Sequence, residues 1–377
     1  MEEKKMIYLN DFLQRNNVNL WQCFETVREG LEGLRSCYAE DLRYKENELE
    51  LVKIIVVDAV FVVEVLLKCS GIGLRGDNDR MFNEWILSAV RTELLLLENQ
   101  LPFFILEDLW WLGTKGYLSL KRYCYDFFLQ NNFLKENEKC WEQLRPKHLL
   151  DLLRMFYEPA SSTAQGQDGQ QHSSCAAQTV LCIPNAKAED EPVLCIPNAT
   201  RLHEAGVELK MTKTNELLDI VFTNGTLEIP VLEISDDTES ILRNLIAFEQ
   251  CHNCKKSYLS HYARVMDYII NTPKDVDLLV EKGIVVNLLG HSDDVCTIIN
   301  RLGDGVSISF GTNFHYARLY KEVDSHCKTP WHQWKATLKH DYFNTPWAII
   351  SFIAAVVLIV LTIIQTACSI ISTKNGK

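Results

Sequence analysis

Residues 93–108 read ELLLLENQLPFFILED, and this stretch decides much of the fold. Pro102 has no backbone N–H to donate and disfavours helical backbone at Leu101, so the pattern predicts a helix, a break and a second helix. Glu98 and Asn99 are expected to bond the backbone groups that the break leaves unpaired. The side chains that we expect to be buried here are Leu95, Leu96, Phe103 and Phe104.

Helical spacing dominates both halves of the chain. Residues 54–67 are almost wholly apolar except for Asp58 and Glu64, and they are too few to cross a membrane, so we expect a helix buried in a core. Pro146 lies where the first turn of a further helix tolerates proline. The apolar positions of that helix are Leu149, Leu152, Leu153 and Phe156. A later amphipathic face carries Leu259, Ala263, Met266 and Ile270.

Residues 272–275 read TPKD and combine an N-cap, a proline and an acid three residues after the cap. This order predicts the start of a short helix, which Gly283 is expected to end.

Strand signals are confined to one part of the chain. Residues 217–223 and 226–234 flank the dipeptide Asn224-Gly225, which favours a type I′ hairpin turn because both of its residues accept positive φ. Pro230 lacks a backbone donor, so we expect its strand to lie at a sheet edge or to contain a bulge.

The expected fold class is mainly α (α+β): a helical body with a small, hairpin-containing β-sheet and one C-terminal transmembrane helix. Residues 206–211 are a candidate third strand. The predicted parts are an N-terminal helical part at 1–158, a polar linker at 159–199, a hairpin and helical part at 200–325, a juxtamembrane segment at 326–345 and a membrane anchor at 346–372. The linker repeats VLCIPNA at 180–186 and 193–199, which indicates one local duplication.

The C-terminal region carries the strongest signal of location. Residues 342–373 contain no charged side chain, and the apolar run from Trp347 to Ile371 makes a helix of about 37 Å, enough to cross a hydrocarbon layer of about 30 Å. Trp347 fits the interfacial position of aromatic residues. A buried core helix is the alternative. We expect a single-pass anchor in the plasma membrane or an endomembrane.

The expected topology places the body in the cytosol. The first residues, MEEKKMIYLN, contain no apolar signal region, and the apolar run comes close to the end of the sequence, which is typical of tail-anchored insertion. The triplets that begin at Asn198 and Asn224 match glycosylation sites, and in a cytosolic body they would stay unmodified.

Composition excludes several classes. A hydrophobic content of 47% is that of a globular body, so disorder throughout is excluded. The net charge of -12, without a basic stripe, argues against a nucleic-acid partner. The 13 cysteines are an odd number scattered singly, which fits reduced structural thiols.

Motifs for catalysis or metal binding are weak. Residues 71–76 match GxGxxG, but the run before them has helical length and a loop follows, so a glycine loop is the better interpretation. Cys251, His252 and Cys254 could begin a zinc site with His326, Cys327 or His332, although structural zinc usually shows two spaced pairs. GxSxG, HExxH and P-loop motifs are absent from the sequence. We therefore predict no catalytic residue, cofactor or metal.

Several of these stretches, taken together, resemble a large plant family known as domain of unknown function 247. The matching segments are 55–64, 94–104, 147–152, 199–207, 227–230, 238–252, 271–276, 282–284 and 346–349. The residues that we expect to be structural determinants are Asp58, Glu98, Asn99, Pro102, Phe103, Phe104, Asn224, Gly225 and Glu249. Family members usually begin some tens of residues earlier, and a truncated gene model or a decayed copy would explain a start at MEEKK.

The resemblance implies a plant membrane protein without known catalytic residues. Some grass relatives act as pollen-side determinants of self-incompatibility, which suggests recognition of a protein partner. We therefore expect a membrane-anchored recognition or scaffold protein. The alternative is a membrane-tethered hydrolase or transferase whose site is built from dispersed groups such as Asp58, Glu98, His148 and His252. A site that brings these groups together would favour the enzyme.

Overall fold

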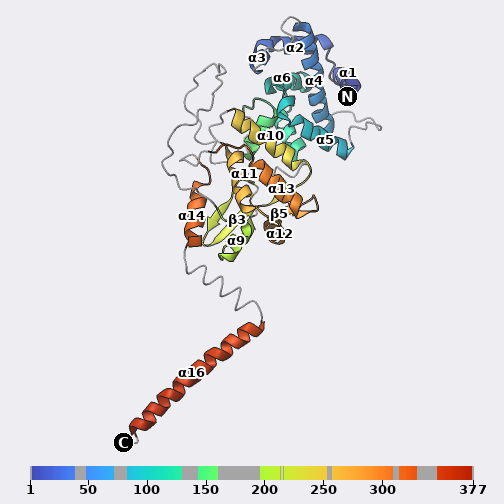
Figure 1. Ribbon diagram of the computed structural model, residues 1–377. Helices are drawn as coiled ribbons and strands as arrows, with labels where there is room; N and C mark the ends of the chain where they lie inside the picture. Colours follow the sequence, from blue (N-terminus) through green and yellow to red (C-terminus); the bar gives the residue numbers. More distant parts are fainter. Residues whose placement is uncertain are drawn as a thin grey trace, which may run out of the picture.

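The chain folds into a mainly helical body with two small sheets and a long C-terminal helix (Figure 1). The computed structural model describes residues 2–38, 48–71, 83–129, 143–159, 196–212, 214, 216–252, 257–308, 314–328 and 346–375. The two halves of the body share one hydrophobic core.

The first half is a bundle around helix α4. Its elements are α1 (Glu2–Asn16), α2 (Leu20–Glu29), α3 (Leu31–Ser36), α4 (Glu48–Cys69), α5 (Glu84–Leu94), η2 (Leu97–Asn99), α6 (Phe103–Thr114), α7 (Leu120–Leu129) and α8 (Leu149–Tyr157). Helix α4 packs against α1, α2, α6 and α7, and most of its side chains are buried, as the apolar run at 54–67 predicts. Buried Glu64 accepts two hydrogen bonds of 2.6 Å from Arg15 of α1, so its charge is paired.

The second half combines helices with strands. Its helices are α9 (Ala199–Glu204), α10 (Thr238–Cys251), α11 (Tyr258–Ile269), α12 (Pro273–Glu281), α13 (Ser292–Leu302) and α14 (Ala317–Lys328). The predicted amphipathic face of α11 is buried at all four positions. Helix α12 begins with the predicted capping box of Thr272 and Asp275, and Gly283 follows its end with a φ of 70°.

The strands are β1 (Glu208–Thr212), β2 (Val221–Thr223), β3 (Thr226–Pro230), β4 (Leu232–Ile234) and β5 (Val285–Asn287). One sheet has the order β1-β3-β2, with β1 parallel and β2 antiparallel to β3, and β4 pairs with β5 in parallel. Asn224 and Gly225 turn the β2–β3 hairpin with φ of 52° and 83°, which confirms the predicted turn. A side chain at Gly225 would also meet His326 of α14, since its Cβ would lie 2.9 Å from the imidazole Cε1.

The edge position predicted for the strand with Pro230 is wrong, because β3 is the middle strand. Strand β2 stops short of this residue: Val221 pairs with Glu228, whereas Pro230 pairs only with Thr212 of β1. The last residue of this central strand therefore has a neighbouring strand on one side and none on the other. Because β2 does not reach Pro230, the missing N–H costs no hydrogen bond to β2.

Three expectations near the helix break also need correction. Leu95 and Phe103 are buried as expected, whereas Leu96 and Phe104 are half-buried. The ring of Phe104 packs against Gly30 and Gly33, and the residue is partly exposed to solvent. Helix α8 is capped by His148 and starts at Leu149, so Pro146 precedes the first turn.

Other expectations fall partly outside the described residues. These include the linker from residue 160 to 195, with the first copy of VLCIPNA, most of the GxGxxG segment and the segment at 329–345. The second copy of VLCIPNA ends in the described part, where Ile196 is buried and Asn198 caps α9.

Helix α16 (Pro346–Asn375) extends away from the body (Figure 1). Its side chains are described at 350–351 and 353–366, where all are exposed, so those of Trp347 and Ile371 lie outside this set. No helix within the described residues is long and apolar enough to cross a membrane. The transmembrane character expected for residues 346–372 stays a prediction.

Phe103→Ala should lower the free energy of unfolding by about 3–5 kcal/mol, because the ring is only 1% exposed and its removal leaves a cavity. Phe104→Ala should cost distinctly less, since part of its ring already faces solvent. Urea denaturation of the purified protein measures both. An equal loss for the two variants would contradict the burial described here.

Candidate functional site

The break between α5 and α6 is held by the side chain of Gln100. Its Nε2 donates to the carbonyl oxygens of Leu94 and Leu96 at 2.9 and 2.7 Å, which are groups freed where α5 ends. Its Oε1 accepts the N–H of Leu150 in the first turn of α8 at 3.0 Å. The N–H of Phe103 donates to the carbonyl of Lys147 at 2.7 Å, so the break and the start of α8 are joined twice.

The same break contacts α10 in the second half. The N–H of Leu97 donates to Asn244 Oδ1 at 2.8 Å, and Asn244 Nδ2 donates back to the carbonyl of Ser240. Nearby, Ser88 of α5 donates to Asp237 at the start of α10 at 2.9 Å. Hydrogen bonds from the break therefore reach both α8 and α10.

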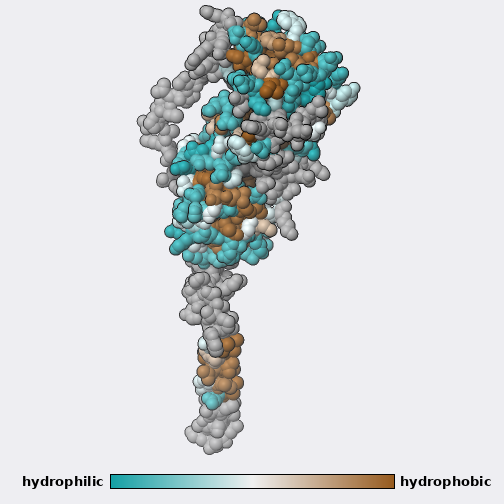
Figure 2. All heavy atoms as spheres, turned by 90° about the vertical axis from the view of Figure 1, so that its right-hand side faces the viewer, coloured by the Kyte–Doolittle hydropathy of each residue, from teal (hydrophilic) through white to brown (hydrophobic). Residues whose placement is uncertain are grey.

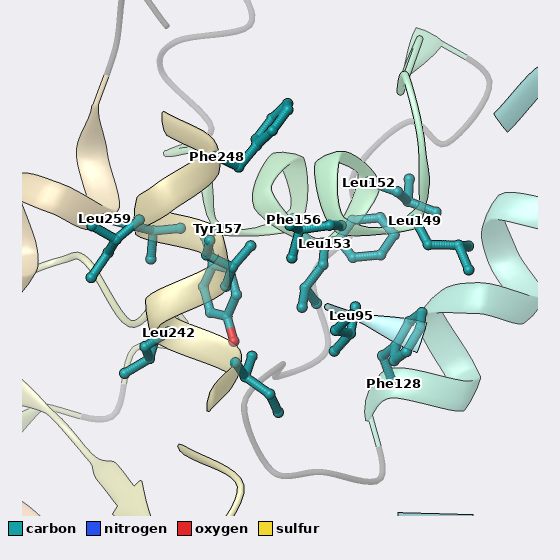
Figure 3. Close-up of a cluster of buried hydrophobic side chains, with 14 of the residues drawn as sticks. Leu95, Phe128, Leu149, Leu152, Leu153, Phe156, Tyr157, Leu242, Phe248 and Leu259 are labelled. Atoms are coloured by element: carbon teal, nitrogen blue, oxygen red, sulfur yellow. The ribbon is translucent and has the colours of Figure 1, made fainter. Parts of the chain in front are cut away.

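Apolar packing lies beneath these bonds. Figure 3 shows Leu153 and Phe156 of α8 at the centre, with Leu95 and Phe128 of the first half on one side and side chains of α10 and α11 on the other. Helix α8 is thus the element at which the two halves meet.

Two histidines of the proposed dispersed enzyme site do come together here. The ring centroids of His148 and Phe248 are 4.7 Å apart, and those of Phe248 and His252 are 4.4 Å apart. The guanidinium carbon of Arg154 is 5.9 Å from the Phe248 ring centroid. Phe248 is buried, and His252 is exposed at the end of α10.

Helix α8 starts with a reciprocal pair of side-chain caps. His148 Nδ1 accepts the N–H of Asp151 at 3.2 Å, and Asp151 Oδ2 accepts the N–H of Lys147 at 2.9 Å. Asp151 Oδ1 also accepts from Arg154 Nε at 3.0 Å, and Arg154 donates to Glu158 at 2.6 Å. The polar groups at this end of the helix are thereby paired.

Burial controls the protonation of both histidines. It lowers the pKa of His148 from 6.5 to about 4, with the Asp151 carboxylate opposing this shift and His252 adding to it. It also lowers the pKa of His252, and the charge of Lys147 acts in the same direction. Both imidazoles are therefore held toward the neutral form.

Glu249, another residue of the resemblance, caps a helix from within the core. Its carboxylate accepts the N–H groups of Leu259 and Ser260 at 3.1 and 2.8 Å and the hydroxyl of Ser260 at 2.7 Å. Burial raises the pKa of Glu249, while these hydrogen bonds act against that shift. The geometry gives Glu249 the role of holding the start of α11 against α10.

Asp275 joins two helix starts in a similar way. Its carboxylate accepts from Thr200 and Asn198 at the start of α9 and from Thr272 at the start of α12. Burial opposes ionisation, but the hydrogen bonds from Thr200 and Thr272 outweigh it and lower the pKa of Asp275. Two segments quoted for the family resemblance, 199–207 and 271–276, thus meet at one carboxylate.

The other predicted residues lie elsewhere. Asp58 pairs with Lys5 of α1 at 2.7 Å, and exposed Glu98 lies in η2. Asn99 Nδ2 donates to the backbone carbonyl of Glu93 at 3.2 Å, so it bonds a backbone group near the break as expected. Among the described residues, no backbone hydrogen bond of this kind is found for the Glu98 side chain.

The zinc candidates are not assembled in the described part of the chain. His252 contacts Phe248, whereas His326 contacts Phe222 of the hairpin at a ring distance of 5.4 Å. Cys254 and His332 lie outside the described residues, and no group of three metal-binding side chains is found within them.

Sequence reasoning missed Gln100, the residue with the most connections at the break. Gln100 lies in the ENQLPF motif, where the backbone hydrogen bonds were expected from Glu98 and Asn99 instead. A side-chain amide can donate twice and also accept, which suits a helix break where two carbonyls and one N–H need partners. An amide side chain beside a predicted helix break is thus the sequence feature that could have identified Gln100.

A helical body whose two halves are joined at a capped helix break is the class of structure that this geometry defines. The model of a plant protein family of unknown function, domain of unknown function 247, matches residues 1–361, so the chain belongs to this family.

Two proteins of Arabidopsis thaliana are similar to the chain. One UPF0481 protein is 28% identical over 357 residues, which cover 91% of this chain and 72% of that protein. A putative UPF0481 protein is 28% identical over 167 residues, which cover 44% of this chain and 31% of that protein. No solved structure matches.

Gln100→Ala should lower the free energy of unfolding by about 2–4 kcal/mol, because it leaves the Leu94 and Leu96 carbonyls and the Leu150 N–H without their partner. Glu98→Ala, two residues away and exposed, is the matched control and should change stability by less than about 0.5 kcal/mol. Urea denaturation of both variants is the measurement. A larger loss for Glu98→Ala than for Gln100→Ala would contradict the assignment.

Proposed function

We propose that this protein is a membrane-tethered recognition or scaffold protein of plants, with a cytosolic body that binds a protein partner, and that it is not an enzyme. The observation that carries the proposal is a set of exposed apolar side chains on the face around strand β5. Soluble bodies rarely gather such side chains on one face without a partner.

The large apolar residues exposed on the elements around β5 include Met211, Val280 and Leu288, and we take them as the β5 face. These residues are 46%, 41% and 59% exposed. Met211 Sδ lies 3.6 Å from the place of a Cβ on Gly283, and Gly283 bonds the carbonyl of Val280, so β1 and the end of α12 approach each other here. Figure 2 shows hydrophobic side chains gathered in the lower part of the body, on the side where Figure 1 places α12, β5 and α13.

The proposed tether is helix α16. It contains no charged residue before Lys374, and its described apolar side chains face outward along its length. Outward apolar side chains on every face suit a helix surrounded by lipid. A single crossing between Trp347 and Ile371 is part of the proposal.

Asn198 supports a cytosolic body. Its amide nitrogen donates to Asp275 Oδ2 at 3.1 Å and its oxygen accepts the N–H of Arg201. A sugar attached to this nitrogen would lie against the Asp275 carboxylate and disturb the starts of α9 and α12. The proposed recognition role also agrees with the family resemblance, since some grass relatives act in self-incompatibility.

A hydrolase or transferase is the second candidate, favoured by the approach of His148 and His252 to one phenylalanine. Two features speak against it. His148 Nδ1 already accepts the N–H of Asp151. Asp58 forms an ion pair with Lys5, away from the cluster of His148, Phe248 and His252. If the purified body turned over a metabolite and Asp58→Asn abolished this turnover, the enzyme would replace the recognition protein.

Proximity labelling with the full-length protein in plant cells tests the proposal. We expect a reproducible set of neighbouring proteins at one membrane, and the double variant Met211→Ser, Leu288→Ser should lose most of them because it removes the apolar contacts. Val221→Ser is the matched control, since Val221 is 41% exposed on β2 and pairs with polar Glu228.

The tether is tested in the same cells by adding charge to α16. Leu358→Arg with Leu361→Arg should release the protein from the membrane fraction, because charge within a hydrocarbon layer is costly. Identical neighbours for the β5-face variant and the wild type would refute the recognition surface. A wild-type protein found outside the membrane fraction would refute the tether.

A further inference from the structure

The start of α8 depends on an imidazole nitrogen that must be unprotonated. His148 Nδ1 accepts the N–H of Asp151 at 3.2 Å, and a helix start has several N–H groups that need such an acceptor. A protonated imidazole carries N–H on both nitrogens and cannot accept. Protonation of His148 therefore removes this cap.

The surroundings of His148 add to this sensitivity. Lys147 and Arg154 of the α8 segment carry positive charge, and His252 of α10 contacts the same phenylalanine ring. The Asp151 carboxylate acts on His148 in the opposite direction, and it already accepts hydrogen bonds from Lys147 N–H and Arg154. Phe248 offers the imidazole an apolar face.

We propose that His148, Phe248 and His252 form an acid-sensitive joint between α8 and α10, in which protonation of His148 breaks the α8 cap and loosens the two halves of the body. The joint lies beside the hydrogen bonds of Gln100, so its opening reaches the break between α5 and α6 through Leu150. This regulatory property is independent of the proposed recognition function.

The direction of the effect follows from the pKa values. The folded state lowers the pKa of His148 from 6.5 to about 4, so acid favours the state in which the imidazole is released. The stabilisation is complete above a pH of about 6.5 and is lost as the pH falls toward about 4. One proton sets a limit of about tenfold per pH unit on the opening equilibrium, and partial exposure of His148 makes the change smaller.

Hydrogen exchange of the full-length protein in mild detergent tests the joint. Amide protection is compared between pH 7.5 and 4.5 after correction for intrinsic exchange rates. Protection of the α8 amides from Leu150 to Leu153 should fall in the wild type over this interval. In His148→Asn it should not change, because asparagine keeps a capping acceptor that does not titrate.

Two further histidines serve as controls. His203→Gln on exposed α9 should behave as the wild type. His261 is a buried imidazole whose pKa is also lowered to about 4 by its burial, and its Nδ1 accepts the N–H of His315. Its acid response should therefore appear in α11 and at residues 314–316 and should persist in His148→Asn.

Constant α8 protection in the wild type, or an equal acid loss in His148→Asn, would overturn the proposal. Should His148→Asn fail to fold, an NMR titration of the wild-type histidines decides instead. The proposal requires one imidazole with a titration midpoint well below pH 6.5 and a change in the chemical shifts of the α8 amides at the same midpoint. It is overturned if the α8 chemical shifts follow the titration of no imidazole.

Discussion

The amide of Gln100 is the constraint on which the rest of the body depends. It satisfies two carbonyls at the end of α5 and one N–H at the start of α8, and its neighbours Leu97 and Phe103 continue these bonds to α10 and to Lys147. A break of this kind, half-buried between helices, leaves backbone polar groups without helical partners. One side chain that both donates and accepts resolves this, and α8 can then pack its apolar face between the two halves.

The same device recurs in the second half with carboxylates in place of the amide. Glu249 holds the start of α11, and Asp275 holds the starts of α9 and α12. Each links elements distant in sequence through unpaired N–H groups at helix starts, where negative charge is also favoured by the helix dipole. Acidic residues that look catalytic in a sequence can therefore be structural, and their charge is stabilised by the backbone that they order.

Local patterns predicted the helix break, the hairpin and the capping box because each depends on a few adjacent residues. They could not predict that β3 is central despite Pro230, since this depends on where β2 stops. They also misjudged Phe104, which packs against the distant Gly30 and Gly33 and is half-buried. The role of Asp275 required α9 and α12 to meet, and the contact of His148 and His252 with the same Phe248 ring required α8 to lie on α10. Tertiary contacts of this kind have no local signature, so the candidate site was predicted only in fragments.

We infer that the break at Gln100 makes the two halves one cooperative unit. Native-state hydrogen exchange in increasing, sub-denaturing urea measures this directly, because it gives an opening free energy for each helix. We expect the slowly exchanging amides of α4 and of α11 to converge on the same opening free energy and the same urea dependence. Opening of the amides of α10 to α13 together at lower urea, while those of α4 stayed protected, would contradict a single cooperative unit.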